Sequence, residues 1–189
     1  MNFQNLEKSS PKNIGLLLLA SPQQPEQSEF SRSVIVVINH KEKLGSLGLI
    51  LNKPLRLTLN DFAEDQWENF ENVPVFKGGP VEQNRLIVTA LEWDEEQNWV
   101  RWHLNLKGWQ LSSLVNSDAQ LRLQAFCGYV GWQAGQLEKE IQEGFWLPAP
   151  VMPQNLFAAN NKKLWEKLMS IYYPLQPYKN LLPNDPSFN

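Results

Sequence analysis

One cysteine and two histidines are the residues of this sequence most able to do covalent chemistry. Cys127 is the only cysteine, and the histidines are His40 and His103. A thiolate is a strong nucleophile when a neighbouring base or a helix N-terminus lowers its pKa. Cys127 ends a predicted strand just before a glycine-rich stretch, so a cysteine-dependent enzyme or redox sensor is one hypothesis. The alternative, which we favour, is that Cys127 is a small buried apolar residue.

The glycine-rich stretch 128–135, GYVGWQAG, precedes a predicted helix. Free backbone N–H groups at a helix N-terminus can bind an anion, which makes Gly128 and Gly131 candidate ligand-binding residues. The spacing G-x-x-G-x-x-x-G matches neither the P-loop nor the dinucleotide fingerprint. Glu138 and Glu140 also place negative charge in the first helical turns, where they would repel a phosphate. We therefore favour a structural role, in which the glycines let the strand turn sharply.

A set of polar residues follows two predicted strands. Asn39 and His40 come after one strand, and Asn52 comes after the next. Ligands of α/β sheets often bind beyond the carboxyl ends of strands. Together with Arg32, these residues form a candidate polar rim for a ligand. The alternative, which we favour, is that Asn39 and Asn52 cap loops, because asparagine tolerates turn geometry.

Composition excludes several classes of function. The chain has 189 residues and a net charge of −3, with a pI of about 5.5. Its basic residues are dispersed, whereas a nucleic-acid binder usually carries a basic face, so direct nucleic-acid binding is not expected. Two histidines are too few for a metal site, and we predict no metal and no cofactor. A single cysteine allows no intramolecular disulfide, which fits a reducing compartment.

The apolar run 14–20, IGLLLLA, superficially resembles a short signal peptide. Glu7 lies in the would-be basic region, and Pro22 lies where a small-residue cleavage site is required. A buried strand is the better interpretation. No stretch reaches the length of a membrane-spanning helix, so we predict no membrane association and a cytoplasmic location.

Hydrophobic patterning predicts the elements that must position these residues. Trp99 is the best candidate for an exposed aromatic residue, and the other tryptophans mostly occupy apolar positions. Gly45 is the expected pivot of one turn, and Gly78–Gly79–Pro80 is predicted as a tight turn with positive φ. Gly144 is expected to end the helix at 136–143. Strands are predicted at 14–20, 34–38, 47–51, 73–76, 85–91, 99–106 and 121–127, and helices at 58–64, 108–115, 136–143 and 161–171.

Five segments together resemble the YqgE/AlgH family of bacterial proteins. They are GLLLLASP (15–22), FSRSVIVVINH (30–40), GLILNKP (48–54), GGPV (78–81) and GYVGWQAGQLEKEIQEGFW (128–146). The resemblance implies an α/β (α+β) fold, with a mixed, strongly bent β-sheet that forms a pseudo-barrel and helices packed outside. It also implies a cytosolic protein. The family supplies no agreed catalytic residues.

We expect a single domain over residues 1–189, with an ordered core at about 14–172, a polar N-terminal segment and a proline-rich tail.

Three functions are compatible with these observations. The favoured function is a non-catalytic regulatory or interaction module that binds a protein or small-molecule partner. The first alternative is a transcriptional regulator, as some family members are labelled, although no helix-turn-helix with a basic second helix is present. The second alternative is the enzyme or redox sensor that depends on Cys127.

Overall fold

The computed structural model describes residues 16–62, 65–94, 99–116, 120–156 and 163–174. Two short 3₁₀ helices, Leu59–Phe62 and Asp65–Trp67, join β4 to β5. The other elements are, in chain order, β1 (Leu16–Ala20), β2 (Val34–Lys41), β3 (Gly45–Ile50), β4 (Pro54–Thr58), β5 (Pro74–Lys77), β6 (Val81–Asp94), β7 (Trp99–His103), α1 (Gly108–Val115), β8 (Gln120–Trp132), α2 (Gln136–Gln142), β9 (Trp146–Pro150), α3 (Pro153–Leu156) and α4 (Leu164–Tyr172).

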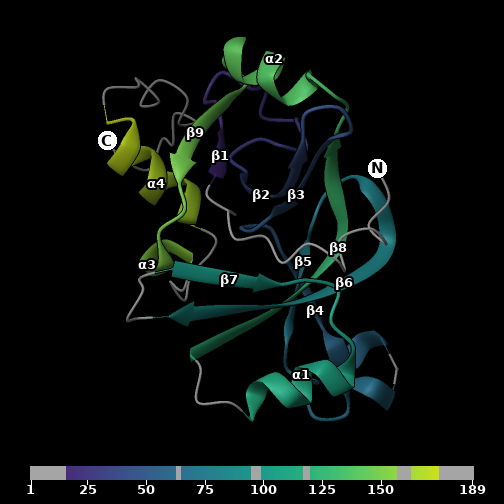
Figure 1. Ribbon diagram of the computed structural model, residues 1–189. Coiled ribbons are helices and arrows are strands. Elements are labelled where there is room, and N and C mark those ends of the chain that lie inside the picture. Colours follow the sequence, from purple (N-terminus) through teal and green to yellow (C-terminus); the bar gives the residue numbers. More distant parts are fainter. Residues whose placement is uncertain (1–15, 63–64, 95–98, 117–119, 157–162, 175–189) are drawn as a thin grey trace, which may run out of the picture.

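All nine strands belong to one mixed, bent sheet with outer helices, so the expected fold class is confirmed (Figure 1). The main path runs β4-β5-β8-β3-β2-β1-β9, and β6 and β7 branch from β8. The β5–β8 pair is parallel, whereas the other pairs are antiparallel. Along this path β4 and β9 are the two edges, so the sheet does not close on itself.

Strand β8 holds the two parts of the sheet together. Its first part pairs with β5 and β6, and its last residues pair with β3. The pairing with β5 ends at Cys127 and the pairing with β3 begins at Val130, and between them Gly128 has φ +72°. A Cβ on Gly79 would lie 2.2 Å from the carbonyl of Tyr129, and one on Gly78 would lie 2.1 Å from the oxygen of Gly128. These glycines are required because the segment that follows β5 crosses β8 at backbone contact distance.

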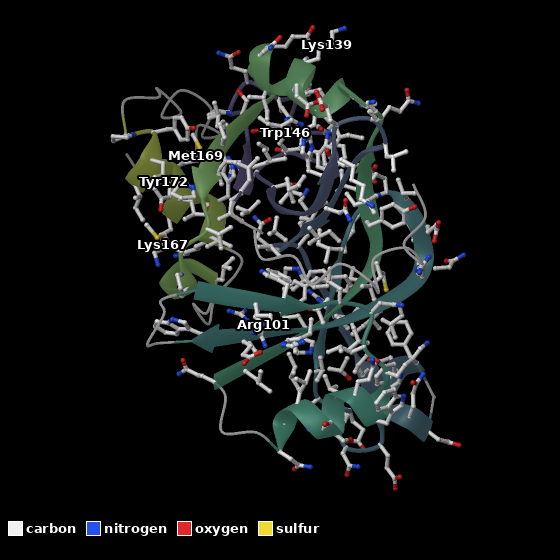
Figure 2. The ribbon with its side chains drawn as sticks, in the orientation of Figure 1. Arg101, Lys139, Trp146, Lys167, Met169 and Tyr172 are labelled. Atoms are coloured by element: carbon white, nitrogen blue, oxygen red, sulfur yellow. The ribbon has the colours of Figure 1, made fainter. Side chains whose placement is uncertain are left out.

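Three hydrophobic clusters fill the fold. The first lies between the sheet and α4, with Leu168 and Met169 fully buried. The second lies under α2 and includes Trp132 and Trp146. The third lies under α1 and includes Leu111. Figure 2 shows the side chain of Met169 turned toward the sheet and that of Trp146 beneath α2.

Several predicted elements are confirmed. Gly45, the expected pivot of a turn, has φ 96°, and Gly144, the expected end of a helix, has φ 76°. The helix at 108–115 has the predicted bounds. Strands β4 and β9 were not predicted, because both contain prolines. Both are edge strands, where a missing N–H donor costs little. The ends of the first strand and last helix, residues 14–15 and 161–162, lie outside the described residues, as do the predicted tails 1–13 and 175–189.

Three local predictions were wrong. The stretch 128–132 continues β8 instead of forming a turn, so Cys127 lies inside a strand. Gly78 and Gly79 do not have positive φ, because their role is close backbone packing. Asn39 and His40 lie within β2, since that strand extends to Lys41. The side chain of Trp99 lies outside the described residues, and the markedly exposed tryptophan is Trp109 on α1, at 73%.

Candidate functional site

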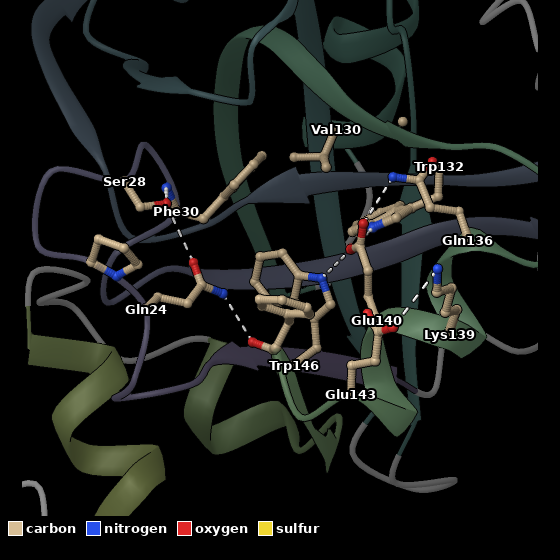
Figure 3. A pocket seen from close by; sticks show the side chains of 13 residues that line it. Gln24, Ser28, Phe30, Val130, Trp132, Gln136, Lys139, Glu140, Glu143 and Trp146 are labelled. Carbon is tan, nitrogen blue, oxygen red and sulfur yellow. Dashed lines mark hydrogen bonds and ion pairs between the residues drawn. The ribbon is translucent and has the colours of Figure 1, made fainter.

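A cavity of about 530 Å³ lies between helix α2 and the loop 21–33 (Figure 3). Its lining comes from residues 24–30 of that loop, 130–132 at the end of β8, 136–143 in α2, and 145–146 at the start of β9. We call it the α2 pocket. Its volume is in the range that accommodates small organic ligands.

The central feature of the α2 pocket is a carboxylate held by two indoles. Trp146 Nε1 donates to Glu140 Oε2 at 2.7 Å, and Trp132 Nε1 donates to the same oxygen at 2.9 Å. Gln136 Nε2 donates to the other oxygen, Oε1, at 2.8 Å. Trp132 and Trp146 are each about 95% buried and meet edge to face, with ring centroids 6.1 Å apart. The position of the carboxylate is therefore fixed by three donors, two of them on buried side chains.

The end of α2 explains how the second indole reaches Glu140. Gly144 adopts φ +76°, and its N–H donates to the carbonyl of Ile141 at 3.0 Å. The N–H of Phe145 donates to the carbonyl of Glu140 at 2.9 Å. This pair of bonds is the Schellman motif, which reverses the chain after a helix. The reversal places Trp146 directly below the helix that it has just left.

The opposite wall of the pocket is the loop 21–33, which closes against the start of β9. Gln24 Nε2 donates to the carbonyl of Phe145 at 2.9 Å, and Ser28 Oγ donates to Gln24 Oε1 at 3.3 Å. Phe30 meets Trp146 edge to face, with ring centroids 5.5 Å apart. The pocket therefore combines aromatic carbon with a few directed polar groups, the usual composition of a ligand site.

Two lysines anchor this loop: Lys77 at the end of β5, and Lys53 immediately before β4. Lys77 Nζ lies 2.6 Å from Glu29 Oε1, and Lys53 Nζ donates to the backbone oxygen of Glu29. Burial lowers the pKa of Lys53, and the nearby charge of Lys77 lowers it further, while Glu29 acts in the opposite direction. Both lysines therefore hold the loop at the same residue, Glu29.

The predicted polar rim is divided between the two ends of β2. Asn52 donates to the carbonyl of Arg32 at 2.8 Å and accepts from the N–H of Val34 at 2.8 Å. At the far end of the strand, His40 Nδ1 lies 2.9 Å from Ser46 Oγ. Six residues of extended chain separate the two ends by about 20 Å. The structure brings Arg32 and Asn52 together and places His40, with Asn39 beside it, elsewhere.

Asn52 and Arg32 both make contacts that have a structural role. Asn52 is 7% exposed, and its two bonds hold the backbone around Arg32, which has φ +51°. The guanidinium of Arg32 lies over the ring of Trp165 at 5.9 Å and 3.9 Å from Glu166. These contacts connect the end of loop 21–33 to helix α4, so Asn52 and Arg32 position the wall of the α2 pocket from outside it.

Cys127 lies away from the α2 pocket and packs against the cluster under α1. Burial raises the pKa of its thiol, which disfavours the nucleophilic thiolate at neutral pH. His103 Nε2 lies 2.7 Å from Glu92 Oε2. Of the two candidate glycines, Gly131 lines the pocket and Gly128 does not.

Sequence reasoning missed the residues that form the pocket. The sequence indicates Glu140 as a charge that would repel phosphate, and it places Trp132 and Trp146 among the tryptophans at apolar positions. The signal was their spacing: the carboxylate follows one tryptophan by eight residues and precedes the other by six. Among the described residues, no group of three or more histidine, cysteine, aspartate or glutamate side chains could hold a metal ion. Across the same residues, no helix is long and apolar enough to span a membrane.

Comparisons with known proteins agree with this architecture. A family model described as AlgH-like matches residues 17–172. A UPF0301 protein of Thermobifida fusca is 31% identical over 189 residues, covering 93% of this chain and 94% of the relative. A UPF0301 protein of Chlamydia felis is 38% identical over 161 residues, covering 82% and 84%.

Two solved structures share the fold. The solution structure of the AlgH protein from Pseudomonas aeruginosa has a TM-score of 0.62 at 22% identity, with 93% of this chain and 96% of that chain covered. The crystal structure of a protein from Corynebacterium diphtheriae has a TM-score of 0.66 at 23% identity, with 93% and 95% covered. At these identities the likeness concerns the fold alone. Because the family model spans most of the sequence, from β1 to the end of α4, this chain belongs to the AlgH-like family.

Proposed function

We propose that this protein is a non-catalytic binding module whose ligand site is the α2 pocket. The observation that carries the proposal is the Glu140 carboxylate, held by the indoles of Trp132 and Trp146 in the wall of a cavity of about 530 Å³. A carboxylate fixed in one position before a ligand arrives loses little conformational freedom on binding. Such preorganisation is characteristic of recognition sites.

A binding role agrees better with the geometry than the cysteine-dependent alternative does. The thiol of Cys127 packs against a different hydrophobic cluster from the one beneath the pocket, and burial raises its pKa. His40 and His103 lie beside Ser46 and Glu92 respectively. A nucleophile needs a base within hydrogen-bond reach, and these contacts direct both imidazoles to other groups.

Three further predictions belong to this proposal: a single domain, a cytoplasmic location, and a small-molecule or protein partner. The described strands form one sheet, which supports the predicted single domain. One cysteine in the whole sequence supports a cytoplasmic location, because reducing compartments rarely use disulfides. The net charge of −3 supports a small-molecule or protein partner over direct contact with nucleic acid.

The proposal is tested by screening small metabolites against the whole protein for a rise in melting temperature. A ligand that binds the native state raises that temperature, and the rise increases with the ratio of ligand concentration to Kd. Each hit is then examined in ¹⁵N spectra of the indole N–H groups, assigned with single Trp→Phe variants. We expect hits to move the Trp132 and Trp146 signals and to leave that of Trp109, on α1, unchanged. Hits that move only signals outside the pocket would contradict the proposal, and so would turnover of a substrate that depends on Cys127.

A further inference from the structure

The Glu140 carboxylate retains hydrogen-bonding capacity inside the α2 pocket. A carboxylate offers about four lone-pair positions, two on each oxygen. Oε2 accepts from two indoles, and Oε1 accepts from Gln136. One position on Oε1 therefore remains for a further donor. Because Glu140 lines the cavity, that donor can come from a bound ligand.

The charge of the pocket favours a cation at this position. Its charged lining residues are Glu140, Glu143 and Lys139, which sum to one negative charge. Lys139 Nζ lies 3.7 Å from Glu143 Oε1, and these two side chains are 72% and 47% exposed. None of the ion pairs found among the described residues includes Glu140. Its half-buried carboxylate is thus held by the hydrogen bonds of Trp132, Trp146 and Gln136.

Aromatic carbon lies beside this carboxylate. Phe30 and Trp146 meet edge to face, and Phe145, which is 49% exposed, also lines the cavity. An alkyl chain gains free energy when it packs on such surfaces. The faces of aromatic rings also attract organic cations. An anionic ligand would have to approach two carboxylates, and a purely apolar ligand would leave the free position on Glu140 unpaired.

We infer that the α2 pocket binds a small organic cation, an alkylguanidinium or alkylammonium, with the charged head on Glu140 and the alkyl part against Phe30 and Trp146. This inference rests on the proposed function and adds the chemical class of the ligand. The cavity volume of about 530 Å³ suits a free small molecule. Lys139 lies on the outer side of the helix (Figure 2) and pairs with Glu143 (Figure 3), so it leaves Glu140 available.

The test compares three short-chain probes of different charge on the unmodified protein: n-butylguanidinium, its neutral isostere n-butylurea, and the smaller anion butyrate. The measurement is the titration of the Trp132 and Trp146 indole signals by ¹⁵N NMR. We expect n-butylguanidinium to bind in the millimolar range, n-butylurea to bind about tenfold more weakly, and butyrate to leave the signals unmoved, because only the first donates its hydrogen bonds from a cationic group to the carboxylate. This comparison requires no variant, so a folding defect cannot obscure it.

Two variants assign the effect to one carboxylate. Glu140→Gln should remove the preference for n-butylguanidinium over n-butylurea. Glu138→Gln should preserve it, because Glu138 is on the same helix but faces His40. Equal binding of all three probes, or binding of butyrate, would overturn the ligand class and leave the proposed binding site standing. Failure of all three to move these signals would also overturn the class, whereas the metabolite screen decides the binding function independently.

Discussion

The indole N–H of Trp146 donates to the carboxylate of Glu140 across 2.7 Å, although the two residues lie on different elements, β9 and α2. The same oxygen accepts from Trp132 at the end of β8. One atom therefore joins a helix to two strands. This arrangement makes Glu140 a structural brace as well as the proposed recognition group, and its two roles can be measured separately.

Glu140→Gln should destabilise the protein by about 2 kcal/mol. A glutamine can offer one oxygen to the two indoles, but its amide N–H₂ then faces the N–H₂ of Gln136, so two donors oppose each other. The measurement is the free energy of unfolding from urea denaturation. Glu138→Gln, an exposed change on the same helix, is the control and should stay within about 0.5 kcal/mol. Equal stabilities of the two variants would show that the brace contributes nothing.

Gly79→Ala should destabilise the fold severely, whereas Gly131→Ala should be tolerated. A Cβ on Gly79 would lie 2.2 Å from backbone atoms of Tyr129. A Cβ on Gly131 would lie 3.7 Å from its nearest neighbour, the ring of Tyr129. Overpacking against backbone costs about 3 kcal/mol, and the second change should stay within about 0.5 kcal/mol. Thermal unfolding of both variants checks this. A stable Gly79→Ala variant would mean that the backbone at Gly79 can move away from β8 at little cost.

Asn52→Ala should cost about 2 kcal/mol, because it leaves the carbonyl of Arg32 and the N–H of Val34 without their side-chain partner in a buried position. Asn39→Ala is the comparison variant. Asn39 is only half-buried, in the last residues of β2, and its loss should cost less. Urea denaturation of both variants gives the difference. If Asn39→Ala proves the more damaging change, the assignment of Asn52 as the anchor of the loop 21–33 is wrong.

The thiol of Cys127 should react slowly at neutral pH. Burial raises its pKa, so the rate of alkylation by iodoacetamide should reach half its maximum above the ordinary value of about 8.5. The urea-unfolded protein is the control and should titrate near that value. A native thiol that titrates below the unfolded one would revive the catalytic alternative.

The raised pKa of Cys127 also affects how the stability of the protein depends on pH. Because the native thiol holds its proton more tightly than the unfolded thiol, its contribution to stability is complete below the unfolded pKa. That contribution is lost as pH rises through the folded pKa. Cys127→Ala should therefore reduce the decline of stability at alkaline pH, measured as the free energy of unfolding across that range.

Local patterns in the sequence were sufficient for most elements. The β-branched run of β2, the apolar spacing of α4 and the glycines at 45 and 144 each act through neighbouring residues, so their effect is visible in a short window. Strands β4 and β9 were not predicted because proline disfavours a strand locally. Proline is tolerated in them only because both lie at an edge of the sheet.

The site itself depended on contacts that no short window contains. The sequence alone indicated the family, the mixed sheet and the helix that carries Glu140. The tertiary structure decided that Gly79 packs on β8, that His40 and Arg32 lie at opposite ends of one strand, and that Trp132 and Trp146 share one carboxylate. The physical reason is that hydrogen bonds and close packing between distant segments depend on how the sheet bends, and that bend is produced by all of its strands together.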